Sequence, residues 1–235
     1  MKNAKSLLES LMGGLGNTGG GQGLGGIAQK AKGVWDGQST LTKGAIGGGL
    51  LGLLLSGDAR KIVGTGVQAG GAALIGGLAY KAWQDWKAGA AVPDPAAVPM
   101  ALASPEGTVF MPSDPVAADD LSTRLVQAMV AAAKADGHVT ADERARIDAQ
   151  LGTLGLGAEA QALITAELDA PLDFGRIAAL ARSEEEAAEV YAASLLVVDP
   201  EGAAERGYLS MLAARLKLDP GLVAHLHARA AQLAR

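Results

Sequence analysis

The stretch KADGHVTADE, residues 134–143, places acids, a glycine and a histidine inside an alanine-rich helical pattern. Carboxylate oxygens suit hard divalent cations such as Ca²⁺, Mg²⁺ and Mn²⁺. The same residue types also mark helix ends, because Asp136 and Gly137 can close one helix while Thr140 and Glu143 form a capping box that opens the next. The stretch can therefore be interpreted either as a metal site or as a bend between two helices. The regular Asp-x-Asp-x-Asp-Gly ladder of a calcium-binding EF-hand is missing.

A weak internal repeat carries the same arrangement a second time. The segment LVQAMVAAAKADGHVTADERARIDAQLGTLGL aligns with AAEVYAASLLVVDPEGAAERGYLSMLAARLKL as an apolar helix, an Asp-led break, a Glu-Arg pair and a second apolar helix. Asp136 corresponds to Asp199 and, with one gap, Glu143 corresponds to Glu205. The repeat predicts two helical hairpins packed pseudo-symmetrically.

Helix-start signals recur through the same region. Ser183 with Glu186 reads as a capping box, Asp173 as a cap after Pro171, and Asp219 as a cap before a proline at the first helical position. No alternating strand pattern is present. The sequence therefore predicts an all-α domain of about seven helices over residues 119–235.

Composition separates the two halves of the chain. Of 33 glycines, 23 lie between Gly13 and Gly77. Nine Lys or Arg against four acids in residues 1–92 give +5, whereas eleven against eighteen in residues 119–235 give −7. The basic half suits anionic lipid headgroups, and without interleaved aromatic residues it excludes nucleic acid as the expected partner. With no cysteine in the chain, disulfides and thiolate chemistry are excluded.

The changes in glycine content, charge and proline content along the chain predict four segments. They are a short amphipathic helix and Gly-rich tether at 1–43, a glycine-rich hydrophobic membrane segment at 44–88, a Pro/Ala-rich linker at 89–118, and the helical domain at 119–235. The linker holds six of the nine prolines. It predicts loose coupling between the two halves.

Residues 62–80 are the predicted single membrane span. The stretch from 62 to 79 has no charge, and Tyr80, Trp83 and Trp86 follow it as interfacial aromatic residues. Gly66 and Gly70 have the GxxxG spacing that brings helices together in lipid, which predicts a homo-oligomer. A two-segment hairpin that includes residues 44–57 and a soluble oligomer are the alternatives. The balance of basic residues favours an inside N-terminus and an external C-terminal domain.

The elements KADGHVTADE, VVDPEGAAERGYLSMLA, NAKSLLESLMG and GGLAYKAWQDW together resemble the YebE family of bacterial inner-membrane proteins, whose domain has no known function. The C-terminal part is similar to the TerB (tellurite-resistance) fold. This resemblance implies a location in the bacterial inner membrane and a role in envelope or metal stress.

The TerB resemblance also implies a divalent metal at the acidic breaks. The matching positions are Asp136, Glu143, Asp199 and Glu205, while Pro200 and a spacing one residue shorter alter the second break. Helix capping and surface ion pairs explain the same acids without a metal, so no cofactor is established.

No motif of a nucleophilic or metal-dependent hydrolase is present, because the chain lacks GxSxG, HExxH and a Walker lysine. The sequence predicts a non-enzymatic, membrane-anchored binding or scaffold module of the bacterial envelope, with the lipid bilayer and an unknown protein as partners. The alternative is a divalent-metal-dependent sensor or enzyme that uses the acidic cluster.

Overall fold

The computed structural model describes residues 71–97, 104–135, 139, 141–153, 158–198 and 202–233. These residues form helices and turns, with a single isolated bridge between Thr108 and Met111 and no strand, which confirms the all-α prediction. The helices are α6 (Gly71–Lys87), α7 (Pro115–Ala133), α8 (Ala141–Thr153), α9 (Ala158–Asp169), α10 (Phe174–Ala178), α11 (Glu184–Leu195), α12 (Ala203–Leu216) and α13 (Pro220–Leu233). The predicted N-terminal helix, the block at 44–57 and residues 62–70 of the predicted span lie outside the described residues.

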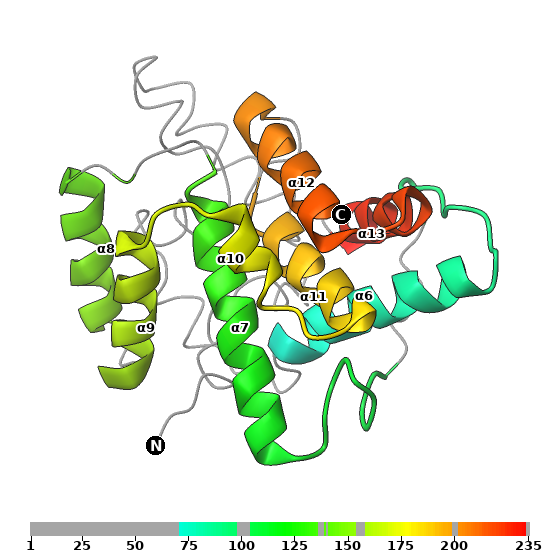
Figure 1. Ribbon diagram of the computed structural model, residues 1–235, viewed down its shortest axis with the longest axis horizontal. Coiled ribbons are helices and arrows are strands. Elements are labelled where there is room, and N and C mark those ends of the chain that lie inside the picture. Colours follow the sequence, from blue (N-terminus) through cyan, green and yellow to red (C-terminus); the bar gives the residue numbers. More distant parts are fainter. Residues whose placement is uncertain are drawn as a thin grey trace, which may run out of the picture.

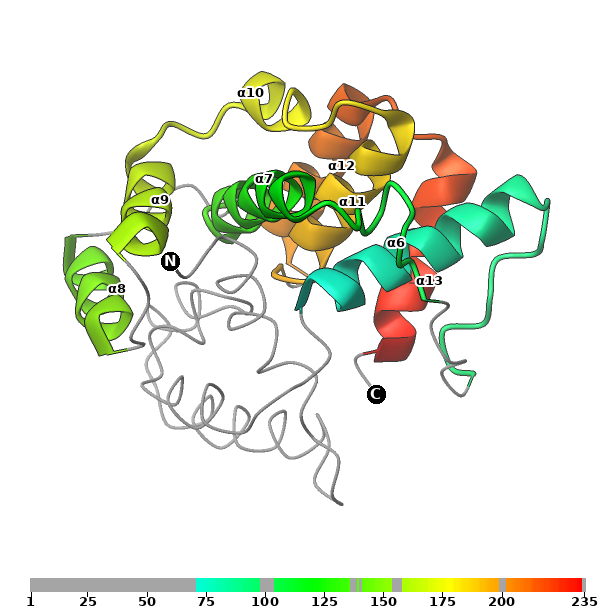
Figure 2. The same ribbon diagram turned by 90° about the horizontal axis from the view of Figure 1, so that it is seen from below.

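Helix α11 lies at the centre of the bundle and packs against α6, α7, α12 and α13. Helices α8 and α9 lie side by side at one end of the molecule, and α6 and α13 lie at the other (Figure 1, Figure 2). Every residue from Ala187 to Leu195 is buried. A helix that is buried on all sides needs small side chains for close packing, which explains the four alanines in this run.

The predicted caps of three helices are present. Ser183 Oγ accepts from the Glu186 amide at 3.2 Å, Asp173 accepts from the Gly175 amide at 2.7 Å, and Asp219 accepts from the Gly221 amide at 2.7 Å. The reciprocal half of the capping box differs from expectation, because the Glu186 carboxylate accepts from the amide of Arg182. These caps fix where α10, α11 and α13 begin.

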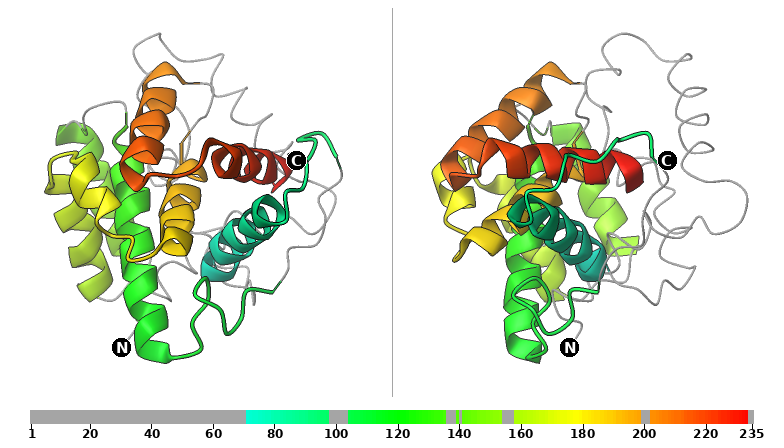
Figure 3. Two further views of the ribbon diagram at one scale, coloured as in Figure 1. Left: turned by 45° about the vertical axis from the view of Figure 1, so that its right-hand side comes forward. Right: turned by 90° about the vertical axis from the view of Figure 1, so that its right-hand side faces the viewer.

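Helix α6 is an element of the same bundle. Its residues Ile75, Leu78, Ala79 and Ala82 are fully buried, and the helix packs against α11 and α13 (Figure 3). Residues 75–79 of the predicted span thus lie in a protein core, and Leu74 and Tyr80 pack against it while partly buried. An apolar stretch suits a protein core as well as lipid, so hydrophobicity alone did not separate the two environments. No helix among the described residues is both long and apolar enough to cross a membrane.

The aromatic residues expected at a water–lipid interface also contact protein. The ring of Trp83 lies 6.3 Å from that of Phe110 and 5.2 Å from that of Trp86, measured between centroids. Trp86 Nε1 donates to Asp219 at 3.1 Å, and the ammonium group of Lys87 lies over both indole rings. These contacts join the end of α6 to the start of α13.

Part of the expected linker is also folded. Phe110 is buried in the core, and α7 begins at Pro115 under the cap of Asp114, four residues before the predicted domain boundary. Gly107 adopts a φ of 76° in the turn that leads to Phe110. Residues 71–87 and 104–118 therefore extend the helical domain beyond the residues that periodicity assigned to it.

The two halves of the internal repeat pack differently. Helices α11 and α12 contact each other as a hairpin, whereas α8 packs chiefly against α9, and α9 packs against α7. The segment between the two repeats, which holds α9 and α10, thus contacts α7, α8 and α12.

Candidate functional site

Helices α7 and α11 run in the same general direction (Figure 1). Two ion pairs join the N-terminal half of α7 to the start of α11 and the residue two positions before it. The Arg124 guanidinium donates to both carboxylate oxygens of Glu186 at 2.6 and 3.1 Å, and Arg182 donates to those of Asp120 at the same two distances.

The predicted metal ligands lie mostly outside the described part of the chain. Asp136 and Asp199 are not described, and Glu143 lies on α8 with a side chain that is not described. Glu205 lies in the first turn of α12, partly buried, and its carboxylate covers the cap residue Gly202 so closely that a Cβ there would collide with it. Glu205 thus occupies the position of a capping glutamate. Among the described residues, no group of three or more His, Asp or Glu side chains could hold a metal ion.

A buried polar cluster lies directly before the first break and is named here the Lys134 cluster, comprising Lys134, Glu167 and Arg176. Lys134 Nζ donates to the carbonyls of Glu167 and Ala170 at 2.6 Å, and a third carbonyl, that of Leu168, lies at 3.4 Å. These carbonyls are the unpaired acceptors at the C-terminal end of α9. Burial lowers the pKa of Lys134, which is also lowered by Arg176 and raised by Glu167.

The two other members of the Lys134 cluster bind each other. The Arg176 guanidinium contacts both carboxylate oxygens of Glu167, one of them at 2.9 Å, and Glu167 is only 3% exposed. The hydrogen bonds that Arg176 donates to Glu167 raise the pKa of Arg176 despite its partial burial. Arg144 of α8 makes a parallel contact with Asp169 at the end of α9. The cluster therefore joins the end of α7 to α9 and α10, and the separate Arg144–Asp169 pair joins α8 to α9.

The Lys134 cluster has a structural role, because its charged groups bind helix ends and one another. The ammonium group of Lys134 is directed at carbonyls, and the carboxylate of Glu167 is occupied by a guanidinium, so neither group is free to act as a base or a nucleophile in this arrangement. Sequence analysis missed this cluster. Its signal is a lysine directly after the apolar run 128–133, where a side chain with a high cost of burial is unusual.

A second polar group joins α6 to α13. Asp85 accepts from Lys81 and from Arg229, each at 2.6 Å, and Arg229 also donates to Gln232 at 3.0 Å. Burial raises the pKa of Asp85, but the hydrogen bonds from Lys81 and Arg229 outweigh that effect and lower it. Lys81 thus pairs with Asp85 within α6, while Arg229 makes the contact between the two helices.

The two histidines of α13 face different groups. His227 Nε2 lies 2.8 Å from the hydroxyl of Tyr191, and His225 Nδ1 lies 2.9 Å from the carbonyl of Gly221. Burial lowers the pKa of His227 and raises that of Tyr191 to about 12. A neutral Tyr–His pair therefore bridges α11 and α13.

Glu189, in the middle of α11, is the least expected side chain of the core. It is fully buried, and neither carboxylate oxygen has a hydrogen-bond partner. Burial raises its pKa well above the usual range, with a further increase from Glu186 and an opposing effect of Arg124. The signal in the sequence is a lone acid within AAEVYAASLL, which the apolar pattern around it concealed.

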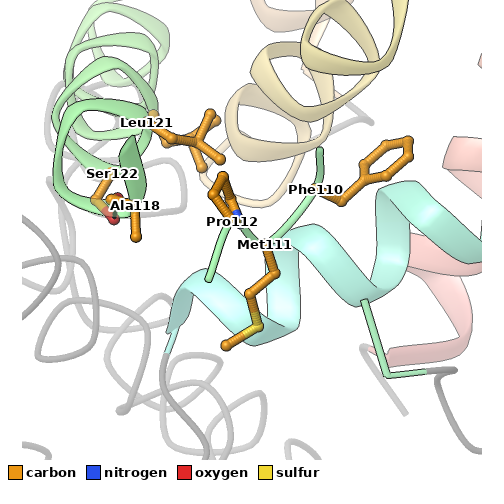
Figure 4. A pocket seen from close by; sticks show the side chains of 7 residues that line it. Phe110, Met111, Pro112, Ala118, Leu121 and Ser122 are labelled. Atoms are coloured by element: carbon orange, nitrogen blue, oxygen red, sulfur yellow. Dashed lines mark hydrogen bonds between the residues drawn. The ribbon is translucent and has the colours of Figure 1, made fainter. Parts of the chain in front are cut away.

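A shallow apolar pocket lies between the turn at 108–112 and the first half of α7 (Figure 4). Phe110, Met111, Pro112 and Leu121 supply most of its walls. The only hydroxyl in its lining, that of Ser122, donates to the carbonyl of Ala118 at 2.7 Å. The pocket offers hydrophobic contact and no charged group.

Comparison with known proteins gives a family without an assigned activity. The family described as "Protein of unknown function (DUF533)" matches residues 40–230. An "Uncharacterized protein in ampR 5'region" of Yersinia enterocolitica is 37% identical over 100 residues, which cover 43% of this chain and 72% of the relative. No solved structure matches significantly. Since the family match covers well over half of the 235 residues, the chain belongs to the DUF533 family.

Proposed function

We propose that this protein is a non-enzymatic, membrane-anchored binding or scaffold module of the bacterial envelope. The observation that carries the proposal is the position of α6. This helix follows the uncharged residues 62–70 without an intervening linker, and its own apolar residues lie in the core of the bundle. A membrane-attached segment before residue 71 would therefore hold the folded bundle at the bilayer surface.

The use of charge inside the bundle supports a binding role over a catalytic one. Arg124 pairs with Glu186, Arg176 with Glu167 and Arg229 with Asp85, and each pair joins two different helices. Charge-assisted hydrogen bonds of this kind fix the relative positions of helices. The result is a rigid body suited to presenting a surface.

The packing of α6 limits how the chain can meet a bilayer. Because α6 begins at Gly71 and its residues 75–79 are buried, the apolar stretches left for lipid contact are 44–57 and 62–70. A span over 62–80 needs about 20 residues free of the bundle. The resemblance to YebE and TerB-like proteins supports the inner membrane and envelope or metal stress as the setting, and Gly66 with Gly70 supports self-association there.

Carbonate extraction of membranes from bacteria that express the full chain tests the proposal. The wild type is expected in the membrane pellet, and the double variant Val63→Lys/Val67→Lys is expected in the supernatant, because the two lysines put charge into the uncharged stretch that is proposed to contact lipid. The matched control is Val92→Lys/Val116→Lys, whose side chains are 48% and 76% exposed. Release of the wild type by carbonate, or equal behaviour of the two double variants, would contradict the proposal.

A further inference from the structure

The buried carboxyl group of Glu189 lies at the contact between α6 and α11. A Cβ built on Gly76 of α6 would lie 3.4 Å from Glu189 Oε1 and 2.5 Å from the carbonyl oxygen of Phe110. Glycine is therefore the residue that lets α6 approach both groups. The carboxyl group is covered by the backbone of α6 and has no water-facing path, since Glu189 is 0% exposed.

The charged groups near Glu189 do not neutralise it. Arg124 of α7 is engaged with Glu186 at 2.6 Å and with the carbonyl of Leu180 at 2.7 Å. Glu186, on the same helix as Glu189, adds a negative charge. On α6, Asp85 accepts from Lys81 of the same helix and from Arg229 of α13, so these three charges are already paired. An ionised Glu189 in this position would be an unpaired buried charge, which costs several kcal/mol.

We propose that α6 stays packed on the bundle only while the buried carboxyl group of Glu189 keeps its proton, and that loss of the proton separates α6 from α11. Helix α6 is the element that moves because it is joined to the rest of the bundle through the chain of residues 88–114. Helix α11 is buried on all sides, and α7 is fixed to it by Arg124.

Proton linkage determines how strongly, and in which direction, the ratio of released to packed α6 changes with pH. In the released state Glu189 meets water and takes a pKa near its ordinary value of 4.5, whereas burial in the packed state raises the pKa well above that value. Between these two values, the ratio of released to packed α6 rises up to about tenfold for each pH unit. Below pH 4.5 the proton stays bound in both states, so the ratio no longer depends on pH.

Thiol labelling of the full chain tests this proposal, because the natural chain has no cysteine. Ala79→Cys places a reporter at a fully buried position of α6, and Ala128→Cys places one at a fully buried position of α7. Exposed Ala90→Cys corrects for the ionisation of the thiol itself. If Ala79→Cys does not fold, as judged by circular dichroism, Ala82→Cys replaces it on the same buried face.

Between about pH 6 and about pH 8, the corrected labelling rate at position 79 is expected to rise up to about tenfold per pH unit while position 128 stays protected. Glu189→Gln should remove the rise, because the amide has the same shape and cannot ionise. Glu184→Gln, an exposed change on the same helix, should keep it. A flat wild-type profile, a rise that persists in Glu189→Gln, or equal labelling at 79 and 128 would overturn the proposal. None of these results depends on membrane attachment.

Discussion

At the scale of single residues, the buried polar side chains of this protein act as ties between helices. Lys134 caps α9 from a neighbouring helix, and Arg124 and Arg229 each bind a carboxylate across a helix contact. Such groups lose their hydration on burial, so each is stable only while its partners are in place. The exception is Glu189, which has no partner and keeps its proton instead.

Replacement of Lys134 by methionine should lower the free energy of unfolding by about 1–3 kcal/mol, because three carbonyls at the end of α9 lose their donor. Urea denaturation monitored by circular dichroism measures the change. Arg215→Met is the control, since it removes the same charge from an exposed position of α12 and should change stability by less than about 0.5 kcal/mol. Equal effects of the two substitutions would show that Lys134 does not cap α9.

The sequence predicted residue roles where the cause is local. The caps at Ser183, Asp173 and Asp219 follow from residues within one turn of the helix start, and all three are present. The Lys134 cluster joins residues 134, 167 and 176, and the isolation of the Glu189 carboxyl group depends on the packing of α6 against α11. Contacts between distant segments leave no periodic signal in one sequence, so these roles could not be predicted.

At the scale of elements, glycines in two helices differ in whether packing requires them. Gly76 in α6 lies against the carbonyl of Phe110, where a Cβ would come within 2.5 Å, whereas a Cβ at Gly207 in α12 would meet open space. The first glycine permits a close contact between elements. The second only lowers helix propensity.

Gly76→Ala should therefore destabilise the protein by about 1–3 kcal/mol through overpacking against a backbone atom. Gly207→Ala should stabilise it by about 0.5–1 kcal/mol, because alanine favours the helix and touches nothing. Thermal unfolding of both variants and the wild type gives the comparison. A stabilised Gly76→Ala variant would mean that α6 does not pack on the Phe110 turn.

The helix content and the capped starts of elements were predictable, but the grouping of elements was not. Residues 71–87 have the composition of a lipid-facing helix, and residues 104–118 have that of a linker, yet both contribute to one core. The repeat predicted two equal hairpins, and the segment that contains α9 and α10 changed how the first one packs. The apolar pattern identifies which residues must be buried. Only the tertiary structure shows which elements they pack against.

At the scale of the whole molecule, α6 connects the two halves that the sequence separates. Residues 71–80 belong to the bundle in the structure and to the predicted span in the sequence. Under the proposed function, release of α6 on loss of the Glu189 proton would free these residues to join 62–70 as one uncharged stretch. The packed and the membrane-spanning arrangements then become two states of the same residues, which differ in the protonation of one side chain.

The central claim is that α6 packs on the helical bundle in the intact protein. The most direct measurement is crosslinking of the double variant Asp85→Cys/Arg229→Cys, in the full chain and in isolated membranes, with a short bis-maleimide at mildly acidic pH. The wild-type side chains of these residues lie 2.6 Å apart across α6 and α13, and replacing both leaves neither of the two as an unpaired charge. The account predicts an intramolecular crosslink that neither single variant forms. Two thiols that each react with a monofunctional maleimide but do not crosslink would contradict it.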